Sequence, residues 1–255
     1  MTARRRFPLH TGVADVVAVT PVTPSMRRFT LRADAFEDFG VEQPGEIVTL
    51  GWPAPGRELV LPRAGWRFPP GNEDQHWRNY TVRSADPARS TIDVDFFLHG
   101  DLGRAAAWAE GAQVGDRVGF AGPRIHWKGA NSADWSLLVA DETGLPALLA
   151  ILETLPAGHR TTVLAEVSDN TERQEVETAA DVELHWLVRG GRPPGTTTVL
   201  SDAVAALEPP RGRGRVWGGG EAMAMRAVRD RLRKPGRSLQ VLGYWKHDRT
   251  PEEMW

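Results

Sequence analysis

The sequence predicts a small antiparallel β-barrel followed by an α/β domain with a parallel sheet. Short β-rich segments, separated by Gly, Pro and Asp clusters, occupy the first half of the 255 residues. After Gly122, apolar strands alternate with helical segments, the pattern of a parallel, doubly wound sheet. The composition, 41% hydrophobic and 25% charged, is typical of a globular chain, and the length allows two domains.

The first domain, expected over residues 1–127, contains six candidate strands. They are rich in valine or alternate apolar with polar side chains, and their spacing indicates an antiparallel six-stranded barrel. The alanine-rich segment 102–110 predicts one short helix between the last two strands. Residues 53–74 carry five prolines and several charges, which indicates a long exposed loop. The candidate strands are 12–20, 26–32, 46–52, 79–84, 91–99 and 117–121.

The second domain, expected over residues 134–255, follows a polar linker at 127–134. Its apolar strands and its helices alternate, which favours parallel strands with helices on both faces of the sheet. The strands are expected at 135–140, 161–167, 183–188, 215–217 and 238–244. The helices are expected at 146–155, 198–207 and 222–234.

Charge and composition exclude several classes of protein. The net charge of −2 and the pI of about 6.4 lack the clustered basic excess of a nucleic-acid binder. No apolar run approaches the length of a membrane span, and the basic start, residues 1–7, has no apolar segment behind it. We therefore expect a cytoplasmic protein without integral membrane contact. The absence of cysteine removes disulfides, thiolate nucleophiles and cysteine-ligated iron–sulfur clusters.

The run Arg78-Asn79-Tyr80-Thr81-Val82-Arg83 has the side chains that a flavin nucleotide needs. Residues two apart in a strand face the same way, so Arg78 and Tyr80 share one face and Thr81 lies on the other. They offer a phosphate partner, a ring to lie beside an aromatic cofactor and a hydroxyl. The run taken alone fits an ordinary barrel strand equally well.

A glycine turn follows the next strand. Asp95-Phe96-Phe97-Leu98-His99-Gly100 precedes Gly103 and the alanine-rich helix, where free backbone N–H groups could receive a phosphate. The small Ala105 and Ala106 would permit the close approach of a pyrophosphate. A plain strand–turn–helix with a structural histidine is the alternative.

Three segments lie at the expected carboxyl edge of the second sheet, where doubly wound sheets bind nucleotides. In Ala140-Asp141-Glu142-Thr143-Gly144-Leu145-Pro146, Thr143 or Gly144 can cap the helix, while the two carboxylates would repel a pyrophosphate. In Trp217-Gly218-Gly219-Gly220-Glu221, a bare glycine turn could support a flat ligand, with Glu221 facing the same cleft. The tail 243–249 places aromatic beside basic side chains, which suits an anionic substrate. A flexible turn and a solvated edge strand are the respective alternatives.

Together these segments resemble the siderophore-interacting protein family, the ferric-siderophore reductases of the ferredoxin-reductase superfamily. The resemblance covers most of the chain, in the expected order. Its segments are Arg78-x-Tyr80-Thr81-Val82-Arg83, Asp93-x-Asp95-Phe96-x-Leu98-His99-Gly100, Trp108-Ala109, Gly115-Asp116, Gly122-Pro123-Arg124, Ala140-Asp141-Glu142-Thr143-x-Leu145-Pro146-Ala147, Trp217-x-Gly219-Gly220-Glu221 and Gly243-Tyr244-Trp245-Lys246.

The resemblance implies an FAD-binding barrel and an NAD(P)H-binding α/β domain. Electrons would pass from NAD(P)H through FAD to the Fe(III) of an anionic siderophore and release iron as Fe(II); no catalytic side chain and no resident metal are implied. The implied cofactor contacts are Arg78, Tyr80, Thr81, Val82, His99, Gly100, Ala105, Ala106, Trp108, Asp141, Glu142, Thr143, Gly220, Glu221 and Trp245. The implied contacts to the ferric complex are Arg124, Lys246, His247 and Arg249.

Departures from the family pattern keep alternatives open. Many members carry a lysine in a Val-Lys-Leu-like run where this chain has Val48-Thr49-Leu50. Arg104, and Ile125-His126-Trp127, also differ from the usual residues. The chain could instead be a general NAD(P)H–flavin reductase, a reductase that serves a partner protein, or a non-enzymatic module that binds a ferric chelate or a nucleotide.

The electron donor is expected to be NADPH rather than NADH, with ferredoxin as a further alternative. Arg173, Arg189 and Arg192 follow strands of the second sheet, where a 2′-phosphate partner could lie, and Asp169 could instead meet a ribose hydroxyl. We expect a monomer. The terminal segment 250–255 could fold back so that Trp255 covers the flavin, although a frayed tail is the commoner outcome.

Overall fold

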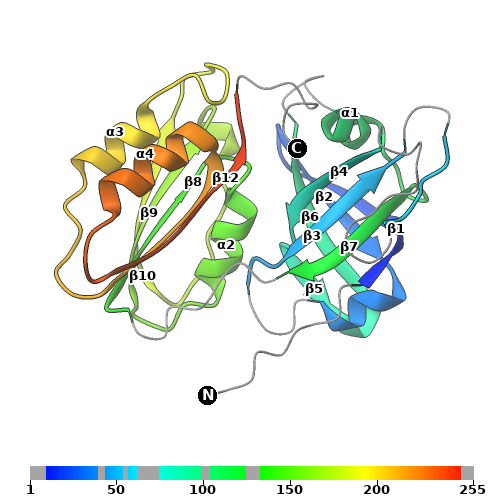
Figure 1. The fold of residues 1–255 in the computed structure, drawn as a ribbon, viewed down its shortest axis with the longest axis horizontal. Helices are drawn as coiled ribbons and strands as arrows, with labels where there is room; N and C mark the ends of the chain where they lie inside the picture. Colours follow the sequence, from blue (N-terminus) through cyan, green and yellow to red (C-terminus); the bar gives the residue numbers. More distant parts are fainter. Residues whose placement is uncertain are drawn as a thin grey trace. The chain divides into compact units, whose positions relative to one another are not determined.

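The computed structural model describes residues 10–39, 44–53, 57–62, 75–98, 104–124 and 133–247, and the account below concerns these residues (Figure 1). They form two compact units, one before and one after the boundary near residues 126 and 127; the short stretch Thr23–Ser25 groups with the second. Most of the predicted loop 53–74 lies outside the described residues, as do His99, Gly100, Arg249 and Trp255.

The first unit is built on a seven-stranded antiparallel sheet with the order β4-β3-β7-β1-β2-β6-β5. A 3₁₀ turn at Asp34–Asp38, another at Pro87–Arg89 and the helix α1, Arg104–Gly111, accompany it. The antiparallel class is as predicted. The strands are β1 His10–Thr23, β2 Met26–Arg32, β3 Ile47–Trp52, β4 His76–Thr81, β5 Ser84–Asp86, β6 Thr91–Phe97 and β7 Arg117–Arg124.

The prediction of six strands was wrong because one candidate strand divides between two partners. β4 pairs with β3, and this pairing ends where the Val82 N–H donates to the Glu46 carbonyl at 2.7 Å. The next N–H, that of Arg83, donates to the Asp93 carbonyl at 2.8 Å, and β5 pairs with β6. The chain thus changes neighbours within two residues, and the short β5 is the seventh strand.

The second unit is a five-stranded parallel sheet with the order β10-β9-β8-β11-β12, as the alternation of segments predicted. Its strands are β8 Trp135–Ala140, β9 Arg160–Val167, β10 Asp181–Val188, β11 Gly214–Glu221 and β12 Arg237–Trp245. Its helices are α2 Leu145–Glu153, α3 Val199–Ala206 and α4 Ala222–Leu232, with a 3₁₀ turn at Asn170–Glu172. No helix in the described ranges is long and apolar enough to cross a membrane.

Alternate side chains of β8 divide the second unit into two cores. Leu138 and Ala140 pack in a cluster with the apolar side chains of α2. Leu137 and Val139 pack in the opposite cluster, which contains residues of α3 and α4. The helices therefore cover both faces of the sheet, as Figure 1 shows.

The strand order reverses between β8 and β11. From β8 the chain continues through α2 to β9, whereas from β11 it continues through α4 to β12 on the other side. Doubly wound sheets bind nucleotides at such a switch point, outside the carboxyl ends of the strands. The residues that follow Ala140 and those around Glu221 occupy that position here.

The predicted glycine turn after a short strand at 215–217 was wrong. β11 continues through Gly218, Gly219 and Gly220, all buried, to Glu221. A Cβ on Gly219 would lie 2.9 Å from the Tyr244 ring, and one on Gly220 would lie 2.8 Å from the Asp141 carboxyl carbon. These glycines therefore admit neighbouring side chains against a strand, and they leave no open backbone surface of the kind predicted.

Candidate functional site

Arg78 and Tyr80 lie on the same face of β4, opposite Leu50 and Val48 of β3. The Tyr80 ring stacks on Phe96 of β6, with the ring centroids 4.1 Å apart and the planes 29° apart. Burial raises the pKa of the Tyr80 phenol well above its usual value, although Arg78 opposes this shift, so the hydroxyl stays protonated as a hydrogen-bond donor. Burial also lowers the pKa of Arg78, whose guanidinium donates to the Trp77 carbonyl at 3.0 Å.

An aromatic cluster extends from this pair. It comprises Trp52, Tyr80, Phe96 and Trp108, and the Trp108 centroid lies 5.3 Å from that of Trp52 and 5.6 Å from that of Phe96. Of these four rings, the sequence analysis selected only Tyr80 and Trp108. Trp52 and Phe96 were missed, and their only signal was that both are aromatic residues within the predicted strands 46–52 and 91–99.

The aromatic cluster and its surroundings fit a flavin nucleotide. The Nε1 group of Trp52 is buried and has no hydrogen-bond partner among the described residues. Such a group, with the Tyr80 hydroxyl and the Arg78 cation, offers polar contacts at the border of a large apolar aromatic surface. Ala105 and Trp108 of α1 pack against the same core and Ala106 is buried, while the side chain of Val82 lies within the core.

Arg124 lies at the end of β7, over the face of the sheet opposite to Tyr80. Its guanidinium donates to the hydroxyl of Thr49 and to the side-chain oxygen of Asn79. The Thr49 hydroxyl in turn donates to the same Asn79 oxygen at 2.8 Å. Thr81 lies two residues after Asn79 on β4, so it shares this face of the sheet, and its side chain is buried. Burial lowers the pKa of Arg124. These contacts hold a partly buried cation beside Thr49, the position at which the sequence departs from the lysine of the family pattern.

Asp141 connects the carboxyl ends of three strands in the second unit. Its Oδ1 accepts hydrogen bonds from the Thr143 N–H at 2.9 Å, the Thr143 hydroxyl at 2.6 Å and the Gly144 N–H at 3.3 Å. Its Oδ2 accepts from the Glu221 N–H at 2.8 Å and from the Trp245 indole N–H at 2.9 Å. Asp141 is therefore a buried hub that fixes Trp245 at the edge of the sheet.

Glu142 and Arg189 form a buried ion pair beside this hub. The guanidinium contacts both oxygens of Glu142, at 2.7 and 2.8 Å, and lies 3.4 Å from Glu166. Burial raises the pKa of Glu166 to about 7, and it also raises the pKa of Glu142 against the opposing effect of Arg189. Burial by itself lowers the pKa of Arg189, but the bond to Glu142 gives a net rise. The interpretation of Arg189 as a 2′-phosphate partner was wrong, because it is 2% exposed and paired internally.

Glu221 ends β11 and caps α4. Its Oε2 accepts from the N–H groups of Met223 at 2.6 Å and Ala224 at 2.9 Å, and its Oε1 lies 3.4 Å from the His247 N–H. The loop after β10 closes over this region, since a Cβ on Gly195 would lie 2.8 Å from the Trp245 ring and 3.1 Å from Glu221. The φ angle of Gly195, 73°, is also one that side-chain-bearing residues rarely adopt.

The remaining candidates of the second unit are more exposed. Lys246 is half-buried, and His247, Arg173 and Arg192 are exposed. The Asp169 carboxylate accepts from the N–H and hydroxyl of Thr171, which engages it in capping a 3₁₀ turn. Among the described residues, no group of three or more His, Asp or Glu side chains could hold a metal ion.

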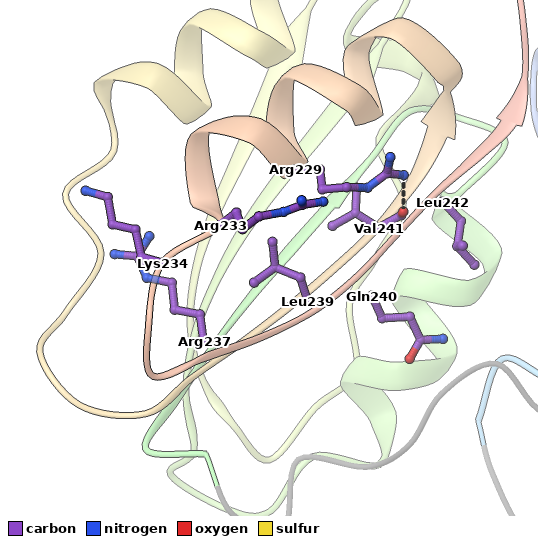
Figure 2. Close-up of a pocket in the computed structure, with 8 residues that line it drawn as sticks. All are labelled: Arg229, Arg233, Lys234, Arg237, Leu239, Gln240, Val241 and Leu242. Carbon is purple, nitrogen blue, oxygen red and sulfur yellow. Dashed lines mark hydrogen bonds between the residues drawn. The ribbon is translucent and has the colours of Figure 1, made fainter.

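A basic surface cavity of about 420 Å³ lies beside the edge strand β12 (Figure 2). Arg229 enters it from α4, Arg233 and Lys234 from the turn that follows α4, and Arg237 from the start of β12. Arg229 donates to the Val241 carbonyl at 2.6 Å. Arg237 also lies over the Trp135 ring. The cavity contains none of the predicted site residues. Cations at a helix C-terminus and along an edge strand stabilise the helix dipole and discourage edge-to-edge pairing.

Comparison with known protein families gives two matches that together span most of the chain. Residues 15–127 match the siderophore-interacting FAD-binding domain, and residues 133–248 match the siderophore-interacting protein family. A siderophore utilization protein from T. fusca has a similar crystal structure, with 35% identity, 96% of both chains covered and a TM-score of 0.84.

Two of the relatives carry reductase names. The chain is 28% identical to the ferric vibriobactin reductase ViuB of Vibrio cholerae, over 93% of this chain and 90% of that one. It is 30% identical to the NADPH-dependent ferric-chelate reductase of Escherichia coli, over 68% and 69% respectively. It is 34% identical to an uncharacterized protein of Mycobacterium tuberculosis, where the match covers 69% of this chain and spans 66% of that protein's length.

Proposed function

Since this chain belongs to the siderophore-interacting protein family, we propose that it is a ferric-siderophore reductase that uses FAD and NAD(P)H. The reductase names of the Vibrio and Escherichia relatives support this reaction, with an anionic Fe(III) chelate as substrate and Fe(II) as product. Each unit would bind one of the two cofactors: residues 1–127 would bind FAD and residues 134–255 would bind NAD(P)H. The reliance on NAD(P)H is consistent with a cytoplasmic site of action.

FAD supplies the redox chemistry when bound, because it accepts two electrons from a nicotinamide and can release them one at a time to Fe(III). The chain's own residues would bind and orient it. We assign the flavin side to Arg78, Tyr80, Thr81 and Val82 of β4 and its continuation, with Ala105, Ala106 and Trp108 of α1. His99 and Gly100 stay predictions outside the described residues.

The stacked Tyr80–Phe96 pair beside Arg78 is the observation that carries the flavin proposal. A stacked ring pair in a fixed orientation presents a flat apolar wall, and the protonated Tyr80 hydroxyl can donate to a heteroaromatic acceptor at its border. Arg78 stays charged despite its burial and can hold a phosphate or an anionic ring. These groups would bind and orient the flavin, and the proposed reaction requires no proton transfer from them.

Arg124 is the best-supported contact to the ferric chelate. Its guanidinium is fixed by Thr49 and Asn79, so little rotamer freedom remains to be lost when an anion binds. It supplies a cation at the position where Thr49 replaces the lysine of the family pattern. Lys246 and His247 of the second unit, with Arg249 outside the described residues, are further candidates for attracting the anionic substrate.

A second candidate function is a general flavin reductase or a reductase that serves a partner protein. The neutral Thr49 favours this reading, since it removes one cation from the face on which a chelate would bind. For the donor, Arg173 and Arg192 stay candidates for a 2′-phosphate and Asp169 for a ribose hydroxyl, and ferredoxin is the alternative donor. We assign the nicotinamide side to the segments that contain Asp141, Glu142, Thr143, Gly220, Glu221 and Trp245.

The purified chain tests the proposal directly. Its absorbance spectrum should show a bound flavin that NADPH or NADH bleaches under anaerobic conditions. Ferric siderophore, free flavin and a simple ferric chelate are then compared as acceptors at equal concentration. Preference for the siderophore supports the proposal, whereas preference for free flavin supports the second candidate. A chain that neither contains FAD nor can be reconstituted with it would contradict both.

A further inference from the structure

A carboxylate of the chain lies at each of the two helix N-termini at the switch point of the second sheet: Asp141 just before α2 and Glu221 as the cap of α4. Dinucleotide-binding sheets usually place a diphosphate at such an N-terminus, where free N–H groups and the helix dipole attract negative charge. Here α2 follows β8 and α4 follows β11, the two strands that flank the switch point. The charges at both N-termini therefore affect how strongly a nicotinamide donor binds at this edge of the sheet.

Before α2, the side chain of Asp141 takes the donors of the two residues that lead into the helix. Its Oδ1 accepts from the N–H groups of Thr143 and Gly144, and its main-chain carbonyl accepts from Leu145 at 3.0 Å. At α4, the Oε2 of Glu221 accepts from Met223 and Ala224, whose N–H groups belong to the first turn of that helix. A diphosphate at either position would have to displace a carboxylate or lie against it.

Among the described residues Glu221 forms no ion pair with a cation, whereas Asp141 is attracted by the nearby Arg189 without pairing with it. Every hydrogen-bond partner of Asp141 and Glu221 in the described ranges is an N–H group or a hydroxyl. Arg189 is the buried cation of this edge, and its ion pairs are with Glu142 and Glu166 instead. Asp141 and Glu221 are both 5% exposed, so water screens their charges poorly.

We propose that Glu221 is a specificity-determining residue, whose carboxylate weakens the binding of nicotinamide donors that carry a diphosphate. The proposal rests on the proposed use of NAD(P)H. The partial positive charge of a helix N-terminus normally favours a diphosphate there, but at α4 the full negative charge of Glu221 precedes the helix. A donor of this kind binds loosely and leaves readily, and a donor without phosphate is not penalised.

The test measures NADP⁺ binding to the full FAD-loaded chain by calorimetry, at low and at high ionic strength. Glu221→Gln keeps a side-chain oxygen that can cap Met223 and Ala224 but removes the charge. Glu221→Ser is a second neutral variant with a preferred capping residue. We expect both to bind NADP⁺ about three- to tenfold more tightly than the wild type at low salt, with the difference shrinking at high salt.

Two controls isolate the charge at position 221. Glu208→Gln removes an exposed carboxylate from the loop after α3, and it should leave NADP⁺ binding unchanged. The uncharged donor 1-benzyl-1,4-dihydronicotinamide should reduce the flavin of the wild type with an apparent affinity that is the same at low and at high ionic strength.

Unchanged or weaker NADP⁺ binding in both neutral variants, with wild-type unfolding temperatures, would overturn the proposal. An equal gain in Glu208→Gln would overturn it as well, because it would show a general charge effect. The calorimetric readout needs no electron transfer. Failure of the ferric-reductase assignment would appear separately, as missing flavin or missing Fe(II) in the same samples.

Discussion

The guanidinium of Arg124 donates a hydrogen bond to the hydroxyl of Thr49, across the pairing of β7 with β3. The same guanidinium donates to Asn79 of β4, so three neighbouring strands fix one cation on one face of the sheet. Many members of the family carry a lysine where this chain has Thr49. In this chain the threonine instead orients a cation that comes from position 124.

Replacing Arg124 should therefore weaken the ferric chelate selectively. We expect Arg124→Met to raise the KM for a ferric siderophore about tenfold, the equivalent of about 1.4 kcal/mol, with flavin content and kcat little changed. Arg117→Met is the matched control, because Arg117 lies on the same strand, is 68% exposed and, among the described residues, forms an ion pair only with Asp15, at 3.5 Å. Steady-state kinetics of both variants measure the KM for the ferric siderophore. An equal rise in KM in Arg124→Met and Arg117→Met would show that the effect comes from the net charge of the protein and not from Arg124 itself.

Tyr80 should matter for FAD through its ring more than through its hydroxyl. Tyr80→Phe keeps the stack on Phe96 and loses one donor, so we expect FAD to be retained with a few-fold weaker affinity. Tyr80→Ala removes the stack, and we expect loss of FAD during purification and a fall of about 2–4 kcal/mol in the free energy of unfolding. Flavin absorbance per protein and urea unfolding measure the two effects. Full flavin content in Tyr80→Ala would refute the assignment of this face to FAD.

Asp141 should stabilise the second unit through both carboxylate oxygens. Asparagine has one acceptor oxygen, so Asp141→Asn leaves donors on one side of the hub without an acceptor, and we expect a loss of about 2–3 kcal/mol in unfolding free energy. Trp245→Phe removes a single bond to the hub and should cost about 1 kcal/mol. Chemical denaturation of each variant measures these losses. An Asn variant as stable as the wild type would show that the hub is dispensable.

Glu166 should make the stability of the second unit pH-dependent. Burial raises its pKa from 4.5 to about 7, so the folded state binds the proton more tightly than the unfolded state. The free energy of unfolding therefore falls as the pH rises from 4.5, the pKa of Glu166 in the unfolded state, to about 7, its pKa in the folded state. Above about pH 7 this destabilisation is complete. Glu166→Gln should raise the unfolding temperature near pH 8 and have little effect near pH 5. The same shift at both pH values would mean that Glu166 does not titrate as described.

Local sequence patterns were sufficient for the class of each sheet. The alternating strands of the first unit and the apolar strands between helices in the second are confirmed. The divided strand at Val82 and Arg83 could not be predicted, because its partners, Glu46 and Asp93, are set by tertiary pairing. The buried glycines of β11 were mistaken for a turn because the side chains that fill their faces, Tyr244 and Asp141, are distant in sequence.

The same limit applies to the site residues. That the carboxylates of Asp141 and Glu142 would repel a pyrophosphate could be predicted from their charge alone. The same repulsion is the basis of the role proposed for Glu221. The pairing of Glu142 with Arg189 spans 47 positions in the sequence, so Arg189 was taken for a ligand contact when it is internally paired. Trp52 and Phe96 were missed because each, considered alone, is an ordinary apolar residue of a strand.

The most direct test of the central claim is the yield of Fe(II) from a ferric siderophore in an anaerobic reaction with limiting NADPH. A ferrous-specific chelator traps the product, and the FAD-loaded wild type is compared with an identical reaction that lacks the protein. We predict about two Fe(II) per NADPH consumed, because two electrons enter and each Fe(III) takes one. Bleaching of the flavin by NADPH without release of Fe(II) from any ferric siderophore tested would contradict the account.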